Sequence, residues 1–493
     1  MSQPLFNKVL VANRGEIARR ILRGLDALNI PSALVYHDAD RRSPAVAQAD
    51  EAVEIEGASP TAAYLDIEQI VAVCGHLDAQ AVHPGYGFLA ENPAFARSLV
   101  AKGITFIGPS AQVMELMGDK IAARAFVAAQ GLPVPPSVDL DPSDAGFGEA
   151  AASLGFPLVV KASAGGGGKG MNIVRDAGEL EGALRLAASE AARYFGDGRV
   201  YVERYFTQIR HIEVQVLGDG ERAVHLGERE CSVQRRFQKV IEEAPSPAID
   251  AGLRARLGEA AVGIAEAASY QGAGTVEFLV TSTGEFHFLE MNTRIQVEHP
   301  VTELVYGVDL VAEQLHIAAG APLRLRQDDL KPTGHAIECR ICAEDPANGF
   351  LPETGRVVHL REPEGEGIRM DSGLHPGQEV TAAFDPLLAK LVTQGASRSQ
   401  AIAKASAALR DLVVLGVRTN AAYLGAILAH PAFAEGATDT AFLDRHADEL
   451  RTQALAADGR ERALAAAHLA DRENRLIDQA LPAVHAALGP WRN

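Results

Sequence analysis

The chain has 493 residues, of which 47% are hydrophobic and 22% are charged, a composition typical of globular domains. At about 100–200 residues per domain, this length predicts two to four domains and leaves little room for extended disorder. The formal net charge of -18 disfavours nucleic-acid binding, and no apolar run reaches the roughly 18 residues that a membrane span needs. A strand-like segment begins at Val9, so we expect no leader peptide and a cytoplasmic protein.

Strand and helix patterns alternate in the N-terminal part of the chain. A strand that ends at Ala12 is followed by the turn Asn13-Arg-Gly15 and by a helix over residues 16–28 with an apolar stripe. This alternation predicts a doubly wound parallel sheet of the α/β class. The first turn lacks the three spaced glycines of a dinucleotide-binding fold, which disfavours such a site. Strands are predicted at residues 9–12, 33–36, 80–83 and 104–107.

A glycine-rich loop follows a predicted strand over residues 156–161, whose last residue is Lys161. Gly167 and Gly168 end a run of four glycines, and Lys169 follows directly. Consecutive glycines expose backbone N–H groups that can wrap around phosphate oxygens, and the two lysines add positive charge. The sequence does not fit a Walker A loop. The alternative is a flexible linker, but lysines on both sides favour a phosphate-binding loop.

A second motif is a predicted β-hairpin with a carboxylate on each strand. Centring its Thr-Ser-Thr-Gly turn places Glu277 directly opposite Glu290, with Asn292 two residues further along the same face. Two opposed carboxylates on a sheet are unfavourable unless a cation neutralises them, and hard oxygen ligands suit Mg²⁺. Phe286 and Phe288 have the same parity as Glu290, which favours a cleft over the alternative, a solvent-exposed hairpin face.

Polar residues alternate directly after the hairpin, at Arg294, Gln296 and Glu298. An extended stretch would present all three on one side, where the arginine can bind a small oxyanion and the glutamate can act as a base. A basic run that ends at Lys239 is either a solvated face or part of the same anion site. Together the two segments predict a site for a small anion in an otherwise acidic chain.

Cys339 and Cys342 form a C-x-x-C motif within a predicted strand over residues 336–343. A zinc site needs a second pair of ligands, and residues three apart in a strand point to opposite faces. We therefore predict a structural role for this pair. Beyond it, the pattern predicts a strand at 357–360 and helices at 397–412 and 419–430.

Five motifs occur together in one order: His83-Pro-Gly-Tyr86-Gly-Phe, Met117-Gly-Asp-Lys120, Lys161 with its glycine loop, Gln234-Arg-Arg, and Glu290-Met-Asn292-Thr-Arg294-Ile-Gln-Val-Glu298-His-Pro. In this combination the chain resembles the biotin carboxylase family of ATP-grasp ligases, from about Val9 to about Leu450. The resemblance implies a pre-ATP-grasp α/β domain at 1–115, an ATP-grasp domain at 116–330 with a mobile lid at about 133–205, a C-terminal α+β biotin carboxylase domain at 331–449, and an Ala-rich helical tail at 450–493.

The resemblance implies an enzyme that uses ATP, Mg²⁺ or Mn²⁺, and bicarbonate to carboxylate biotin on a biotin carboxyl carrier protein through carboxyphosphate. This would be the first half-reaction of an acyl-CoA carboxylase. Implied partners are the carrier protein, a carboxyltransferase subunit, and a second copy of the chain or a larger complex. None of the six methionines flanks a lysine as in a biotin attachment sequence, so the carrier is expected on a separate chain or in a missing C-terminal region.

The resemblance also assigns roles to residues of this sequence. Glu298 would be the base that deprotonates bicarbonate, and Arg340 would stabilise the biotin enolate. The implied catalytic residues are Lys239, Arg294, Glu298 and Arg340, the bicarbonate ligands are Lys239, Arg294, Gln296, Val297 and Glu298, the biotin contacts are Tyr86 and Arg340, and the metal ligands are Glu277, Glu290 and Asn292. The implied ATP ligands are Lys120, Lys161, Gly167, Gly168, Glu203, Arg204, Tyr205, Phe206, His211, Phe237, Glu277 and Glu290.

Phe237 departs from the family pattern, since many members have histidine at this position. A phenyl ring can pack on a ribose but cannot form a hydrogen bond, so the affinity for ATP is expected to differ. Two alternatives stay open: a non-catalytic ATP-binding assembly subunit, and another ATP-grasp ligase with a different acceptor. The retained metal ligands and Glu298 disfavour the first alternative, and Lys239 with Arg340 disfavours the second.

Overall fold

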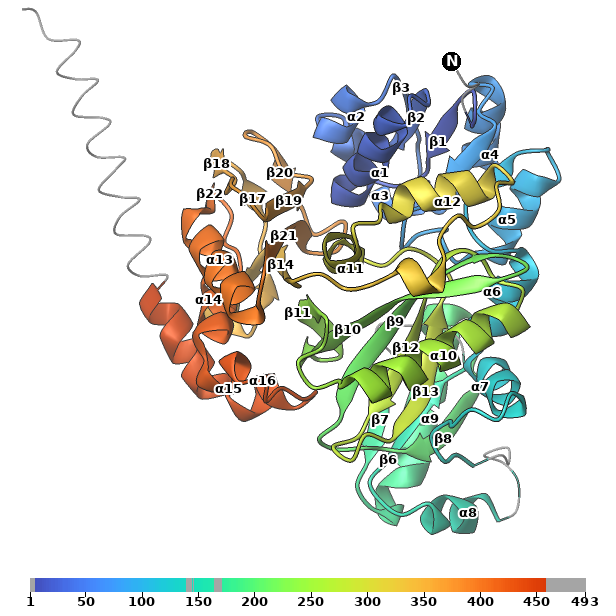
Figure 1. The fold of residues 1–493 in the computed structure, drawn as a ribbon, viewed down its shortest axis with the longest axis vertical. Helices are drawn as coiled ribbons and strands as arrows, with labels where there is room; N and C mark the ends of the chain where they lie inside the picture. Colours follow the sequence, from blue (N-terminus) through green and yellow to red (C-terminus); the bar gives the residue numbers. More distant parts are fainter. Residues whose placement is uncertain (1–4, 139–143, 145, 164–170, 458–493) are drawn as a thin grey trace, which may run out of the picture.

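The computed structural model describes residues 5–138, 144, 146–163 and 171–457 (Figure 1). An N-terminal α/β body, a central body of long strands with a smaller sheet beside it, and a C-terminal body are arranged around one large sheet. The predicted phosphate-loop residues Gly167 and Gly168 and the tail beyond residue 457 lie outside the described residues. Among the helices that the structure describes, none is both long and apolar enough to cross a membrane.

The N-terminal body is a parallel sheet in the order β3-β2-β1-β4-β5, with helices on both faces, as predicted for a doubly wound fold. Val9 and Val11 pack in the core on one face, and Leu10 packs in the core on the other. The elements are β1 (Val9–Val11), α1 (Gly15–Ala27), β2 (Ser32–Tyr36), α2 (Pro44–Gln48), β3 (Glu51–Glu54), α3 (Pro60–Ala63), α4 (Ile67–His76), β4 (Ala81–His83), α5 (Pro93–Val100), β5 (Thr105–Phe106) and α6 (Ala111–Gly118).

A small antiparallel sheet in the order β7-β6-β8 occupies the region that the sequence predicts as a lid. Its apolar side chains, among them Val160, Val174 and Val202, form a separate core with residues of the two helices of this region. These elements are α8 (Phe147–Ser153), β6 (Leu158–Ala162), β7 (Asn172–Val174), α9 (Ala177–Phe195) and β8 (Val200–Arg204). The small sheet and its two helices therefore form a compact unit with a core of its own.

The large sheet has the order β13-β12-β9-β10-β11-β14-β21-β19, and it continues across the expected domain boundary at residue 330. Its strand β11 pairs directly with β14, which brings the ATP-grasp region and the C-terminal region into one sheet. The central elements are α7 (Lys120–Ala129), β9 (Arg210–Asp219), β10 (Ala223–Arg235), β11 (Gln238–Ala244), α10 (Ala251–Ala267), β12 (Gln271–Val280), β13 (Phe286–Asn292), α11 (His299–Tyr306) and α12 (Leu310–Ala318).

In the C-terminal body, α13 and α14 pack on strands β14 and β21 of this sheet. The predicted helices at 397–412 and 419–430 and the predicted strand at 336–343 are therefore confirmed. The strand predicted at 357–360 is wrong in detail, because two short strands with different partners replace it. A helix continues to residue 457. The elements are β14 (His335–Cys342), β15 (Glu344–Asp345), β16 (Leu351–Pro352), β17 (Gly355–Arg356), β18 (His359–Arg361), β19 (Ile368–Ser372), β20 (Glu379–Val380), β21 (Leu387–Gly395), α13 (Arg398–Asp411), β22 (Val413–Leu415), α14 (Ala421–Ala429), α15 (Pro431–Ala434) and α16 (Phe442–Arg445).

Candidate active site

The β12–β13 hairpin pairs Glu277 with Glu290, as predicted. The prediction that Phe286 and Phe288 share the face of Glu290 is wrong. The register shifts after Glu277, so that Phe278 pairs with Phe288 and one extra residue bulges from β13. Residues of β13 before this bulge therefore face the side opposite to the one that their spacing from Glu290 predicts. The phenylalanines pack in the core instead, with the Phe278 and Phe286 ring centroids 5.4 Å apart. The bulge thus leaves the carboxylates on one face and the aromatic rings on the other.

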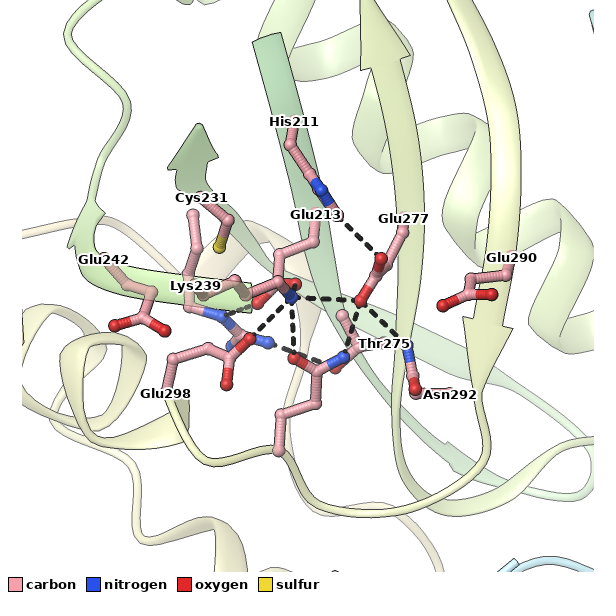
Figure 2. A network of polar contacts seen from close by, with 12 residues as sticks. His211, Glu213, Cys231, Lys239, Glu242, Thr275, Glu277, Glu290, Asn292 and Glu298 are labelled. Carbon is pink, nitrogen blue, oxygen red and sulfur yellow. Dashed lines mark hydrogen bonds and ion pairs between the residues drawn. The ribbon is translucent and has the colours of Figure 1, made fainter. Parts of the chain in front are cut away.

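Glu277 is the most heavily hydrogen-bonded carboxylate of this hairpin (Figure 2). It accepts hydrogen bonds from His211 Nε2 at 2.7 Å, Asn292 Nδ2 at 2.8 Å, Gln296 Nε2 at 2.9 Å and Lys239 Nζ at 3.0 Å. Burial alone would raise the pKa of Glu277, but Lys239 and His211 outweigh burial and hold the pKa well below its usual value. This carboxylate is therefore ionised at neutral pH.

Lys239 lies at the centre of the polar network, on β11 (Figure 2). Its ammonium group donates to Glu213 at 2.6 Å, to Glu298 at 2.7 Å and to Glu277 at 3.0 Å. Burial opposes the positive charge, but the three carboxylates outweigh it and raise the pKa of Lys239 well above its usual value. Lys239 is thus part of a buried site, and the alternative of a solvated face is wrong for this residue, although Arg236 in the same run is exposed.

Glu298 lies between two cations at the start of α11. Its Oε1 accepts from Lys239 at 2.7 Å, and its Oε2 accepts from Arg340 Nη2 at 2.9 Å. Burial would raise the pKa of Glu298, but Lys239, Arg340 and Arg229 together lower it below its usual value. Arg340, from β14, also donates through Nε to Glu242 at 2.6 Å. The structure therefore places the predicted base against the predicted biotin contact.

Arg294 does not lie on a strand with Gln296 and Glu298 as predicted, because the chain after β13 forms an unpaired loop that leads into α11. Its Nε donates to Glu91 at 2.9 Å, and its Nη2 donates to Asn292 Oδ1 at 3.0 Å. Gln296 and Glu298 do meet, at Lys239. A strand prediction fails here because no neighbouring strand is available to pair with the segment.

The predicted phosphate-binding lysines each contact a carboxylate. Lys120, the first residue of α7, pairs with Glu290, and Lys161 on β6 pairs with Glu203 on β8. Glu203 also accepts from Arg124 Nη1 at 2.7 Å. Both lysines are largely buried beside the hairpin or within the small sheet. Positive charge is thus held on both the α7 side and the small-sheet side of the site.

The other predicted nucleotide contacts lie at the end of β8, directly after it, or on the β10–β11 turn. Phe206 stacks on His287 with the ring centroids 5.0 Å apart, while Arg204 is exposed and Tyr205 is half-buried. Phe237 is 42% exposed and has a left-handed φ of 63° in the turn between β10 and β11. An exposed aromatic ring at a turn is available to pack against a ligand.

Tyr86 and Val297 contact a second buried network on the far side of β14. The Tyr86 hydroxyl donates to Glu16, which lies 3.2 Å from the ammonium of Lys390. Lys390 is fully buried and donates to the Val297 carbonyl at 2.7 Å. Arg340 lies close enough to affect the pKa of Tyr86, which burial raises well above its usual value. The two predicted biotin contacts therefore share a region without a direct hydrogen bond between them.

Arg229 and Glu213 form a buried ion pair that none of the sequence motifs predicts. Arg229 is fully buried and also donates to Gln215, Thr302 and Thr275. Glu213 also contacts Lys239, so Arg229 stabilises a carboxylate that holds the lysine in place. The available signal was the alternation of polar residues in β9, where Glu213 and Gln215 interrupt an apolar strand.

Two further groups of ligand-type residues do not form metal sites. Cys339 packs in the C-terminal core, and burial raises the pKa of Cys342 to about 12, so both thiols stay protonated. His430 Nδ1 accepts from the Ala432 N–H at 3.2 Å, which puts the proton of the neutral ring on Nε2, 3.4 Å from Glu449. His446 lies nearby, but His430 with this tautomer has no free lone pair for an ion.

Comparison with known proteins gives matches along nearly the whole described chain. Three family models match: the biotin carboxylase N-terminal domain at residues 5–114, the carbamoyl-phosphate synthase L chain ATP-binding domain at 119–326, and the biotin carboxylase C-terminal domain at 338–445. The biotin carboxylase of Pseudomonas aeruginosa is 46% identical over 444 residues, which cover 90% of this chain and 98% of that protein.

Longer carboxylases match as well. The mitochondrial propionyl-CoA carboxylase alpha chain of Sus scrofa is 45% identical, and the match covers 94% of this chain but only 64% of that protein. The biotin carboxylase domain dimer of 2-oxoglutarate carboxylase from Hydrogenobacter thermophilus, solved with MgADP, ADP and bicarbonate, is 42% identical with a TM-score of 0.88. It covers 91% of this chain and 99% of that one. The chain belongs to the biotin carboxylase family of ATP-grasp ligases.

Proposed function

We propose that this chain uses ATP and bicarbonate to carboxylate biotin on a biotin carboxyl carrier protein. One observation carries the proposal: a buried ionised carboxylate, Glu298, lies between the ammonium of Lys239 and the guanidinium of Arg340. This arrangement suits a reaction that binds a small anion and then removes its proton. The related Hydrogenobacter domain, solved with MgADP and bicarbonate, supports the same choice of ligands.

We propose that ATP binds between the small sheet and the β12–β13 hairpin, within an ATP-grasp domain at residues 116–330. Lys120 and Lys161 would bind its phosphates, together with the glycine loop at Gly167 and Gly168. The segment from Glu203 to Phe206, with His211 and Phe237, would contact the nucleoside. The flanking domains would be residues 1–115 and 331–449. Support comes from the lysines on two sides of the site, each of which now neutralises a carboxylate.

Glu277, Glu290 and Asn292 fit a magnesium or manganese ion. Their donors are hard oxygens, and Glu277 and Glu290 lie directly opposite each other on neighbouring strands. Cationic groups already neutralise these carboxylates, since Lys239 contacts Glu277 and Lys120 contacts Glu290. A bound ion would supply the charge that neutralises the transferring phosphate group.

Bicarbonate would bind to Lys239, Arg294, Gln296, the Val297 backbone and Glu298. Glu298 would take the bicarbonate proton, which leaves an anion able to attack the γ-phosphate and form carboxyphosphate. The pKa of Glu298 is lowered by the cations around it. A bound anion that shares these cations weakens that effect, so substrate binding itself makes Glu298 a stronger base.

Biotin would bind near Tyr86 and Arg340. Carboxyphosphate would release CO₂, and its phosphate would remove the proton from the ureido nitrogen of biotin. The negative charge would then develop on the ureido oxygen, which the guanidinium of Arg340 can stabilise. The network from Tyr86 through Glu16 to Lys390 would form the wall of this pocket.

We further propose that the chain serves an acyl-CoA carboxylase, with a carboxyltransferase subunit and a carrier on another chain or in a further C-terminal region. The match to the longer propionyl-CoA carboxylase alpha chain supports this context. The dimeric Hydrogenobacter domain supports a homodimer or a larger complex. The cytoplasmic location stays a prediction from the sequence.

Release of ADP from MgATP tests the proposal when it is measured with and without bicarbonate and with and without free biotin. We expect release that requires bicarbonate and increases with biotin. Release without bicarbonate would favour another ATP-grasp ligase. Binding of ATP with no release, even with a biotinylated carrier protein added, would favour the non-catalytic assembly subunit.

A further inference from the structure

Arg340 is held by two carboxylates, Glu242 and Glu298, which both contact its Nη2. Its Nη2 donates to Glu298 at 2.9 Å, and its Nε donates to Glu242 at 2.6 Å. Glu242 lies on β11, three residues after Lys239, and its side chain is fully buried. No role for Glu242 follows from the sequence motifs, yet it is the partner that fixes the stem of this guanidinium.

A second buried carboxyl group, that of Glu338, lies directly opposite Glu242 across the β11–β14 pair. Neither oxygen of Glu338 nor Oε2 of Glu242 has a hydrogen-bond partner among the described residues. Two opposed buried carboxyls do not both ionise readily, because burial and mutual repulsion raise their pKa values. One proton therefore stays on the pair, and Glu338, which has no arginine partner, is the group that keeps it.

The two partners of Arg340 behave differently during the proposed reaction. Glu298 accepts a proton as the base, and a neutral carboxyl group holds a guanidinium less strongly than a carboxylate does. The contact between Glu298 and Nη2 of Arg340 is then weakened. Glu242 takes no part in proton removal, so its contact with Nε persists. Nη2 of Arg340 thereby loses one of its two carboxylate contacts and becomes available to biotin, while Glu242 keeps the side chain in place.

We infer that Glu242 is the positioning residue of Arg340, and that it keeps the guanidinium aimed at biotin after Glu298 has been protonated. The inference rests on the proposed function, since it assigns a task within the biotin step. It concerns a residue that acts through Arg340 and does not touch the substrate.

Glu243 provides a matched control on the same strand. It is also buried and points to the opposite face of the sheet, where it accepts from His335 at 2.6 Å and from Arg398 at 2.6 and 3.0 Å. Its replacement by glutamine breaks a buried ion pair of similar kind but leaves Arg340 untouched. A purely structural role of Glu242 predicts that the two glutamine variants behave alike.

The test compares wild type with Glu242→Gln, Glu243→Gln, Arg340→Ala and the double variant Glu242→Gln/Arg340→Ala. Two rates are measured for each: bicarbonate-dependent ADP release without biotin, and its stimulation by free biotin. For Glu242→Gln we expect kcat/KM for biotin to fall about 10- to 100-fold, as for a lost charge-assisted hydrogen bond, with biotin-free release within about twofold of wild type. Glu243→Gln should keep the wild-type kcat/KM for biotin.

The double variant separates positioning from independent effects. Because Glu242 acts through Arg340, the double variant should be no slower with biotin than Arg340→Ala alone. Additive losses, an unchanged kcat/KM for biotin in Glu242→Gln, or an equal loss of both rates would overturn the inference. If Glu242→Gln does not fold, Glu242→Asp decides by the same two rates, because it keeps the charge but shortens the reach to Nε. Absence of bicarbonate-dependent release in wild type would instead contradict the proposed function.

Discussion

Two regions of the large sheet, the β12–β13 hairpin at one edge and the β11–β14 pair nearer the middle, differ in how their carboxylates are neutralised. At the β12–β13 end, Glu277 and Glu290 each contact a lysine, and burial is outweighed so that the pKa of Glu277 is held well below its usual value. In the β11–β14 pair, Glu242 and Glu338 face each other, and burial raises both pKa values. The hairpin thus suits the cation and phosphate binding proposed for it, and the β11–β14 pair holds a proton beside Arg340.

The hairpin and the β11–β14 pair also differ in the sequence separation of the segments that they join. The β12–β13 pairing joins neighbouring segments through one short turn, so its register follows from local sequence. The β11–β14 pairing joins segments almost a hundred residues apart and crosses an expected domain boundary. Strand β11 connects the two regions, because its Lys239 contacts Glu277 of the hairpin and its Glu242 faces Glu338 on β14. Changes in each region test whether this division of tasks is real.

The largest effect is expected at Glu298, which contacts Lys239 on β11 and Arg340 on β14. Glu298→Gln keeps the shape but cannot accept a proton, so turnover should fall about 10²- to 10⁴-fold. The dissociation constant for MgATP should stay within about threefold of wild type, since Glu298 contacts Lys239 and Arg340 and no predicted nucleotide ligand. Calorimetric titration and ADP release measure the two quantities. An equal loss of binding and turnover would contradict the role of Glu298 as the base.

A large loss of stability is expected from Arg229→Met. This change removes the only guanidinium that the structure shows bonded to Glu213 within the described part of the chain, and it leaves that carboxylate fully buried beside Lys239. Breaking such a pair costs about 3–5 kcal/mol of unfolding free energy, measurable by urea denaturation. The double variant Arg229→Met/Glu213→Leu should recover part of that loss. No recovery would mean that the arginine stabilises the fold through its other contacts.

The pH dependence of stability should have opposite signs in the two regions. In the β11–β14 pair, burial raises the pKa of Glu242 to about 7, so between its usual value and about 7 the native chain binds more protons than the unfolded chain. Stability from this group therefore falls as pH rises through that window. In the hairpin, Glu277 stabilises the fold above its usual pKa and loses this effect as pH falls.

Urea denaturation at about pH 5 and about pH 8 checks this sign. Glu242→Gln should lose less stability than wild type between the two values, because glutamine does not titrate. Glu243→Gln serves as the control, since the pKa of Glu243 is lowered and its titration lies below the window. An identical change in unfolding free energy between the two pH values for wild type and Glu242→Gln would show that Glu242 is not the titrating group.

The smallest effect is expected from Phe237→His at the β10–β11 turn. Phe237 is exposed and has no hydrogen-bonding group, whereas an imidazole can donate to a nucleotide. One added hydrogen bond should lower KM for ATP about 2- to 10-fold with little change in kcat. An unchanged KM would mean that the ring already contributes as much by packing.

Local patterns predicted the N-terminal sheet and the opposed carboxylates, because strand periodicity and turn composition act over short distances. The strand Glu51–Glu54 was missed since charged residues occupy both of its ends. The parity of Phe286 and Phe288 was wrong because a bulge after Glu277 is a register shift that composition does not reveal. The pairing of the carboxylates was right even though the strand beyond them was not.

Non-local contacts set the limits of prediction in the site. Arg229 and Glu213 come from separate strands, and nothing near either residue in the sequence marks them as partners. Glu91, which contacts Arg294, lies some two hundred residues away from it. The resemblance to biotin carboxylases supplied Lys239 and Arg340, which residue patterns alone had left ambiguous or unmarked. The position of Glu242 follows only from the pairing of β11 with β14.

Formation of carboxylated biotin is the decisive test of the proposed reaction. Wild-type chain is incubated with MgATP, free biotin and ¹⁴C-labelled bicarbonate, and the label attached to biotin is counted. We expect ATP-dependent labelling of biotin that disappears in Glu298→Gln and falls strongly in Arg340→Ala. ATP cleavage without any label on biotin, or labelling that survives the loss of Glu298, would contradict it.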